Sequence, residues 1–316
     1  LSQYGHAFYS DFAERMAVNE ERPDIGLRRE GYLFMVWGKE AVAGAEAVWR
    51  IATDLGAPVE LIDGPQVQAL HPSIDVSDVD AALWSPQDMW IDPHAALTGF
   101  ARKARDLGVQ YIEDRVVDLE LEGSKVVRAR LESGRCISLE QVVNCANCWA
   151  PDICAMVGLT IPVEPMRRQT FFFECRQSLP PLPITRDLSG LSFRPEGGGY
   201  IAGLTHLSEP RGFNWEVDYQ WFDETIWPAL ARRIPAFEAV KARRAWSGHY
   251  DQNALDGNPI LGYCPGALAR LSTLRKNPRA KESRSPGNGV VGIQFFRSPR
   301  PLLFPEQQYS KKIMEM

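Results

Sequence analysis

The sequence contains no long apolar run. A helix that crosses a membrane needs roughly 20 consecutive apolar residues, and no stretch of this chain approaches that length, so we expect no transmembrane segment. Basic residues are not in excess either. The chain has 35 Lys and Arg residues against 40 Asp and Glu residues, a formal net charge of −5, which argues against nucleic acid as a partner.

The cysteines form neither a disulfide framework nor a zinc site. There are six, irregularly spaced, which is typical of an intracellular protein. Cys145 and Cys148 form one Cys-x-x-Cys, but no second pair completes a zinc site. Since Cys145 ends an expected buried strand, we interpret the pair as packing residues rather than a redox dithiol, and we assign no metal.

The first half of the chain alternates strand and helix patterns. GYLFMVW (31–37) has the composition of a buried strand, and residues 41–56 have apolar positions at helical spacing. Asp92 and Pro93 start a second helix that ends at Gly108 and leads into another strand, an order that predicts a βαβ layer. Residues 125–144 predict a hairpin around Ser133 and Gly134.

The pattern changes after Ile161. Three strand-like segments are separated by Pro and Gly, with a helix predicted over 218–234; the segments are MRRQTFFFEC (166–175), LSFRPEG (191–197) and GYIAGLTH (199–206). This favours a mixed or antiparallel sheet, interleaved with the first layer rather than following it. The 316 residues are enough for about two domains.

Four motifs stand out: VVNCANCWA (142–150), IPVEPMRRQ (161–169), WPALARRIPAFE (227–238) and WSGHYDQNALDGNPILG (246–262). The last combines an aromatic strand with a turn rich in Asp, Asn and Gly. In these motifs and their order the chain resembles the D-amino-acid, glycine and sarcosine oxidase (DAO) family of FAD-dependent oxidoreductases. The resemblance covers residues 20–265 and is greatest to a mitochondrial branch and its bacterial relatives.

The resemblance implies FAD as cofactor and an α/β (α+β) fold, in which a Rossmann-type FAD-binding layer is interleaved with a mixed or antiparallel substrate-binding sheet. It assigns residues 1–160 and 240–266 to the FAD-binding layer. The substrate-binding sheet takes residues 161–239, with 30–90 as a candidate contributor.

Both ends depart from the family pattern. The family opens with a strand, a Gly-x-Gly-x-x-Gly turn and a helix, and later has a Gly-Phe-Ser-Gly-His-Gly turn against the flavin; the sequence contains neither. From Ala267 onward ten Lys or Arg residues face three acidic ones without apolar periodicity. We therefore expect the chain to be an incomplete copy of a family member, with a shifted reading frame or a foreign tail after about residue 269. We expect this copy to be inactive as it stands. We also expect no packed element over residues 267–316.

The resemblance also implies cofactor-binding residues: Val116, Cys145, Ala146, Asn147, Trp149 and Asp256. The alternatives are a core valine at Val116 and a surface turn at Asp256. Asn147 stands where the family has Gly, so the tight turn there predicts a positive φ, which Asn tolerates at some cost.

The substrate is expected to be a small amine or amino acid whose carboxylate is held by Arg168 or Arg194, because an Arg fork makes a bidentate pair with carboxylate. The alternative is that both are surface arginines of strands. The catalytic candidates are His206, His249 and Tyr250. Glycine-oxidase-like members have Arg at the position of Tyr250, so the substitution disfavours a glycine-type substrate and leaves a secondary or N-methylated amine open.

The implied reaction is oxidation of a C–N bond to an imine that is then hydrolysed, with oxygen or a quinone or flavoprotein as electron acceptor. The alternative is a flavin-containing assembly factor for respiratory complex I with little or no turnover. The resemblance implies an intracellular protein, cytoplasmic if bacterial and mitochondrial if eukaryotic.

Overall fold

The computed structural model describes residues 2–204, 209–263, 270–272 and 292–296. They form two compact units, each described here by itself. The first contains residues up to 113 together with 164–254, and the second contains 114–163 together with the described residues from 255 onward. No described helix is long and apolar enough to cross a membrane.

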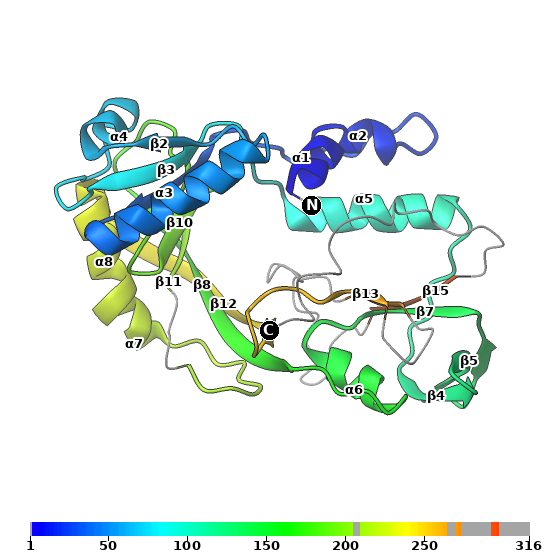
Figure 1. Cartoon of the computed structure of the whole chain (residues 1–316). Coiled ribbons are helices and arrows are strands. Elements are labelled where there is room, and N and C mark those ends of the chain that lie inside the picture. Colours follow the sequence, from blue (N-terminus) through cyan, green and yellow to red (C-terminus); the bar gives the residue numbers. More distant parts are fainter. Residues whose placement is uncertain (1, 205–208, 264–269, 273–291, 297–316) are drawn as a thin grey trace. The chain divides into compact units, whose positions relative to one another are not determined.

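The first unit is built on an eight-stranded sheet (Figure 1). Its strands, in spatial order, are β12 (Val240–Asn253), β8 (Val163–Cys175), β11 (Gly199–Leu204), β10 (Leu191–Glu196), β9 (Ile184–Asp187), β1 (Tyr32–Val36), β3 (Ala81–Ser85) and β2 (Glu60–Ile62). β1 and β2 both pair antiparallel with β3, so they run parallel to each other on either side of it. β1 is also parallel to β9. The strand predicted after Gly108 (Val116–Glu122) belongs to another sheet, so it does not form one layer with β1 as the order of elements predicted. The predicted mixed sheet is confirmed.

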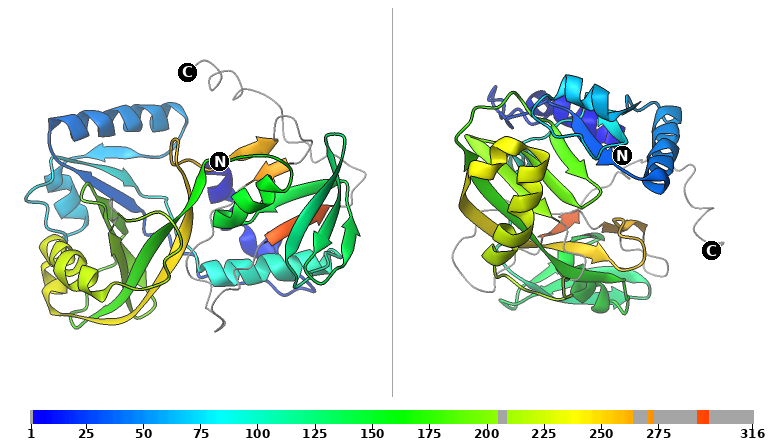
Figure 2. Two further views of the ribbon diagram at one scale, coloured as in Figure 1. Left: turned by 90° about the horizontal axis from the view of Figure 1, so that it is seen from below. Right: turned by 90° about the vertical axis from the view of Figure 1, so that its left-hand side faces the viewer.

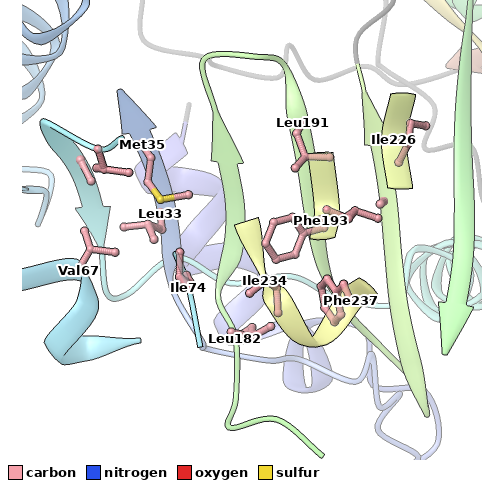
Figure 3. Close-up of a cluster of buried hydrophobic side chains, with 14 of the residues drawn as sticks. Leu33, Met35, Val67, Ile74, Leu182, Leu191, Phe193, Ile226, Ile234 and Phe237 are labelled. Atoms are coloured by element: carbon pink, nitrogen blue, oxygen red, sulfur yellow. The ribbon is translucent and has the colours of Figure 1, made fainter. Parts of the chain in front are cut away.

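One face of this sheet is covered by helices that bury the main core. They are α4 (Gly64–Leu70), α7 (Tyr219–Trp221), the π-helical η2 (Phe222–Ile226), α8 (Trp227–Arg233) and the short 3-10 segment η3 (Pro235–Ala239). Figure 3 shows side chains of this core, among them Leu33, Leu191, Phe193 and Phe237. Alternate residues of each strand point to this core because side chains along a strand alternate between the two faces.

The opposite face receives α3 (Lys39–Asp54), which packs through Ala45 against Val36 and Ala81. Figure 2 shows α3 in blue on one side of the sheet and the yellow-green helices α7 and α8 on the other. On β8, β10 and β11 this opposite face carries Phe172, Arg194 and Ile201. We call it the arginine face.

The helix predicted from Asp92 begins there. The Asp92 carboxylate accepts hydrogen bonds from the backbone N–H groups of His94 (2.8 Å) and Ala95 (3.2 Å), which caps α5 (Pro93–Asp106). Gly108 follows the helix with φ +87°, a conformation that glycine adopts without strain.

The amphipathic N-terminal segment forms α1 (Ser2–Ser10) and α2 (Phe12–Arg15), which lie beside α5 (Figure 1). The rings of Phe8 and Phe12 lie 5.8 Å and 5.0 Å from the ring of Phe100. Gly99 permits this approach, because a Cβ there would lie 2.8 Å from the ring of Phe12.

The second unit contains two small sheets. One is formed by β4 (Val116–Glu122), β5 (Lys125–Leu131) and β6 (Cys136–Ser138), and the other by β13 (Leu261–Tyr263), β14 (Arg270–Ser272), β7 (Gln141–Cys145) and β15 (Gly292–Phe296). The hairpin predicted around Gly134 is confirmed, since β5 and β6 pair antiparallel and Gly134 has φ +85°. After β7 the chain continues into η1 (Asn147–Trp149) and α6 (Ala150–Ala155).

Two expectations differ from the structure. No packed element was expected after residue 266, yet β14 and β15 pair with the two edges of β7, whose backbone groups need partners. The other residues after 263 lie outside the described part. Residues 240–253 were assigned to the FAD-binding layer, whereas β12 lies beside β8 in the eight-stranded sheet, with Val240 and Ala245 packed against its core.

Candidate functional site

The predicted site residues divide between the two units. The first unit holds Arg168, Arg194, His249 and Tyr250, and the second holds Val116, Cys145, Ala146, Asn147, Trp149 and Asp256. His206 lies outside the described residues.

Strand register places Arg194 on the arginine face. Arg194 pairs with Ile201, which pairs with Phe172 on the next strand, and directly opposed residues of paired strands share a face. Phe193, one residue before Arg194, points into the main core on the other side. The direction of the Arg194 side chain is therefore set by the alternation of side chains along β10 and not by a loop.

Arg194 already has an anionic partner. Its Nη1 donates to Oε2 of Glu196 (2.6 Å) and to the carbonyl of Pro195 (3.0 Å), and its guanidinium carbon lies 5.4 Å from the ring centre of Trp90. The Arg194 side chain is only 12% exposed. Sequence reasoning missed both partners, although Glu196, two residues along the strand, shares the face of Arg194 and could have been found from that spacing.

Arg168 lies over an aromatic ring. Its guanidinium carbon is 5.2 Å from the ring centre of Tyr250, which joins the adjacent strands β8 and β12 in a cation–π contact. Such a contact uses the flat face of the guanidinium, whereas a carboxylate is bound by the N–H groups at its edge. The pair therefore orients Arg168 in a way that is compatible with anion binding.

Arg168 and Arg194 stand at separate positions on the arginine face. Arg168 lies four residues from Phe172, about 13 Å along β8, and β8 and β10 are two strand spacings or about 10 Å apart. The Cα atoms of Arg168 and Arg194 are then roughly 16 Å apart.

His249 points away from Tyr250. Its Nε2 accepts a hydrogen bond from the backbone N–H of Asn214 (2.9 Å), and its ring lies 4.2 Å from that of Trp215 and 5.1 Å from that of Phe213. Burial lowers the pKa of His249. Because neighbouring residues of a strand face opposite sides, the structure does not bring His249 and Tyr250 together on the arginine face.

The turn after β7 has the predicted conformation. Asn147 has φ +53°, which confirms the predicted positive φ at this position. Glycine adopts this left-handed conformation without strain. The buried Asn144 holds the turn, since its amide donates to the carbonyl of Ala150 (2.9 Å) and its Oδ1 accepts from the N–H of Ala146 (3.1 Å). The side chain of Asn144 thus fixes the backbone of the turn that contains Asn147.

Two further cofactor candidates lie in a strand and in a turn. Val116 is buried in β4 opposite Leu131. Asp256 accepts a hydrogen bond from the backbone N–H of Asn258 (2.9 Å), which lowers the pKa of the Asp256 carboxyl, and Gly257 completes the turn with φ +71°. Within the described residues, no group of His, Cys, Asp and Glu side chains is arranged to hold a metal ion.

Comparison with known proteins places these observations in one family. The family model DAO, described as FAD dependent oxidoreductase, matches residues 1–277. The chain belongs to the DAO family. FAD is the cofactor of this family, so the cofactor prediction is confirmed.

The chain is similar to the FAD-dependent oxidoreductase domain-containing protein 1 of Xenopus laevis, with 31% identity over 303 residues, covering 84% of this chain and 60% of that protein. The Bos taurus protein of the same name is 32% identical over 305 residues, covering 84% and 62%. The human mitochondrial sarcosine dehydrogenase is 24% identical over 271 residues, covering 79% and 29%. The chain thus spans about 60% of the length of the first two relatives.

Solved structures confirm the fold. L-proline dehydrogenase from P. horikoshii has a TM-score of 0.76 at 24% identity and covers 86% of this chain and 71% of its own. Glycine oxidase from Geobacillus kaustophilus has a TM-score of 0.72 at 21% identity, with coverage of 86% and 73%. The predicted α/β fold with a mixed sheet is therefore shared with flavoprotein oxidases and dehydrogenases.

Proposed function

We propose that this protein oxidises the C–N bond of a small amine or amino acid with FAD, and that the substrate binds on the arginine face. The observation that carries the proposal is the Arg168–Tyr250 pair on the sheet of a DAO-family fold. Sarcosine dehydrogenase, L-proline dehydrogenase and glycine oxidase are all named for the oxidation of small amino acids, which supports the substrate class.

Arg168 is the carboxylate anchor in this proposal. Arg194 is paired with Glu196 at 2.6 Å, so a substrate carboxylate there would lie beside another negative charge. Arg168 contacts the ring of Tyr250, and Tyr250 adds a hydroxyl donor beside it. The site therefore selects an amine that carries one carboxylate.

The family cofactor would be held in the second unit by the backbone of the turn at Ala146 and Asn147, with Trp149, Val116 and Asp256 as further candidates. When bound, FAD would supply the hydride acceptor for the carbon next to the substrate nitrogen. The nitrogen loses a proton, the resulting imine is hydrolysed by water to a carbonyl compound and an amine, and the electrons pass to oxygen or to a quinone or flavoprotein acceptor. The protein's part is to orient the amine and exclude water.

The test is the steady-state kinetics of Arg168→Met against an Arg186→Met control, which removes an exposed arginine from β9 of the same sheet. A lost charge-assisted pair costs about 1.5–3 kcal/mol, so KM for an amino acid should rise roughly 10- to 150-fold in Arg168→Met. An amine without a carboxylate should react equally with both variants. Equal KM values of the two variants for amino acids would rule out Arg168 as the anchor.

A further inference from the structure

The segment from Glu209 to Asp218, which we call the strap, is held by side chains of two strands. It contains no helix, and its only strand-like contact among the described residues is an isolated bridge between Arg211 and Met166. Its backbone polar groups must find partners elsewhere. The strands that provide them are β8 and β12.

Three β8 side chains bind the strap, and one of them, Glu164, pairs with Arg211 at 3.4 Å. Arg167 makes a two-point ion pair with Glu209, with Nε–Oε1 and Nη2–Oε2 distances of 2.7 Å and 3.0 Å, and its Nη1 donates to the carbonyl of Glu216 (2.8 Å). Gln169 accepts a hydrogen bond from the backbone N–H of Asp218 through Oε1 (2.6 Å). Both ends of the strap are thereby fixed to the helix-covered side of β8.

Two β12 side chains bind the middle of the strap. The hydroxyl of Ser247 donates to the carbonyl of Trp215 (2.7 Å), and Nε2 of His249 accepts from the N–H of Asn214 (2.9 Å). The ring of His249 also contacts those of Trp215 and Phe213. Since β12 is the edge strand, it has a neighbouring strand on one side only, and the strap adds a second support.

The strap lies behind the proposed substrate anchor. Arg167 and His249 bind the strap on one face of the two strands, while their neighbours Arg168 and Tyr250 meet on the arginine face. A strand that shifts or twists moves both of its faces together. Holding the strap therefore also holds the Arg168–Tyr250 contact.

We propose that His249 is a positioning residue: its unprotonated ring holds the strap on β12, and protonation of the ring releases the strap and loosens the Arg168–Tyr250 pair. The chemical reason is that a protonated imidazole has no lone pair at Nε2 and cannot accept the hydrogen bond of Asn214. The effect on substrate binding rests on the proposed function, whereas the release of the strap does not.

The charges around His249 define the pH range. Burial lowers the pKa of His249, and the nearby Arg167 lowers it further; the Asn214 backbone and Glu209 oppose this shift without reversing it. In the released state the pKa returns to an ordinary value of about 6.5. The state with the strap held therefore binds fewer protons than the state with the strap released. The held state is fully favoured above about pH 6.5. Below that pH, the ratio of held to released protein falls by up to tenfold per pH unit.

The test is limited chymotrypsin cleavage after Phe213 and Trp215 in the FAD-loaded protein between pH 5 and pH 8, normalised at each pH to an unstructured peptide. Cleavage of the natural protein should accelerate as the pH falls below about 6.5. His249→Gln keeps an acceptor that does not titrate, so its cleavage should stay slow at all pH values. His249→Phe removes the acceptor and should be cleaved rapidly throughout, and Ser247→Ala should show a raised rate that keeps the acid dependence.

Fluorescence of Trp215 in the natural protein provides a second readout that does not depend on whether the His249 variants fold. Subtracting the fluorescence of Trp215→Phe from that of the natural protein isolates Trp215, whose emission should titrate with the same midpoint as cleavage. Acid-independent cleavage of the natural protein, or equal acid dependence in His249→Gln, would overturn the proposal. If cleavage behaves as expected while no amine reduces the flavin, the release of the strap is supported and the proposed oxidation fails. If KM for an amino acid rises in acid in the natural protein but not in His249→Gln, the release of the strap and the proposed oxidation are both supported.

Discussion

Arg233 is the residue whose removal should damage the first unit most. It ends α8 with a side chain that is 4% exposed. Its Nη1 donates to the carbonyl of Asp75 (2.7 Å) and to Asp78 (2.9 Å), while Nη2 and Nε donate to the carboxylate of Asp187 at 3.1 Å and 3.3 Å. The guanidinium thus connects the helix layer to β9 and to the loop before β3.

The substitution Arg233→Met leaves Asp187 with its charge buried, since its side chain is 5% exposed. Removing one member of a buried ion pair costs about 3–5 kcal/mol, because the remaining charge loses its partner but stays out of water. Ser189 still donates to Asp187 through its N–H (3.0 Å) and its hydroxyl (2.6 Å), which places the expected cost near the lower end of that range. For a unit of this size the loss corresponds to a fall in Tm of roughly 6–12 °C.

Thermal unfolding monitored by circular dichroism measures this change, and the adjacent arginine provides the control. Arg232 also pairs with Asp78, at 2.9 Å, but its side chain is 71% exposed. An exposed pair contributes about 0–1 kcal/mol, so Arg232→Met should lower Tm by about 4 °C or less. Equal shifts for the two variants would refute the reasoning that burial, rather than charge pairing itself, sets the cost. Replacing Asp187 by Asn together with Arg233→Met should recover part of the loss.

Three further predictions follow from single contacts. Phe237→Ala should cost about 3–5 kcal/mol in chemical denaturation, because its fully buried ring contacts the rings of Phe173 and Tyr200; a loss below 1 kcal/mol would contradict this packing. Asn147→Ala should cost about 1–2 kcal/mol because of the positive φ, whereas Asn147→Gly should not destabilise the second unit, and a thermal shift assay compares the two. Asp92→Ala should lower stability by about 1 kcal/mol through loss of the α5 cap, with Asp92→Asn close to the natural protein in the same assay.

Local patterns predicted the local structure well. The cap at Asp92, the hairpin at Gly134 and the positive φ of Asn147 each depend on one residue and its immediate neighbours. The helix predicted over 218–234 is present but contains the π-helical turn Phe222–Ile226. Pro228 explains this irregularity, since it has no N–H to donate to the preceding turn.

Contacts between distant segments could not be predicted in this way. The Arg194–Trp90 and His249–Asn214 contacts join segments far apart in the sequence, and no periodicity marks either pair. The opposite orientations of His249 and Tyr250 follow from strand alternation, but their partners become known only once β12 is placed beside β8. The family resemblance supplied the cofactor, whereas the side-chain contacts of Arg168 and Arg194 became known only from the structure.

The most direct test of the central claim is the visible absorption spectrum of the purified protein under anaerobic conditions, before and after addition of secondary, N-methylated and D-amino acids. The account predicts bound FAD with oxidised flavin bands that bleach with at least one of these amino acids, and less readily in Arg168→Met. A folded protein that binds FAD but is bleached by no amine, or that binds no FAD at all, would contradict it.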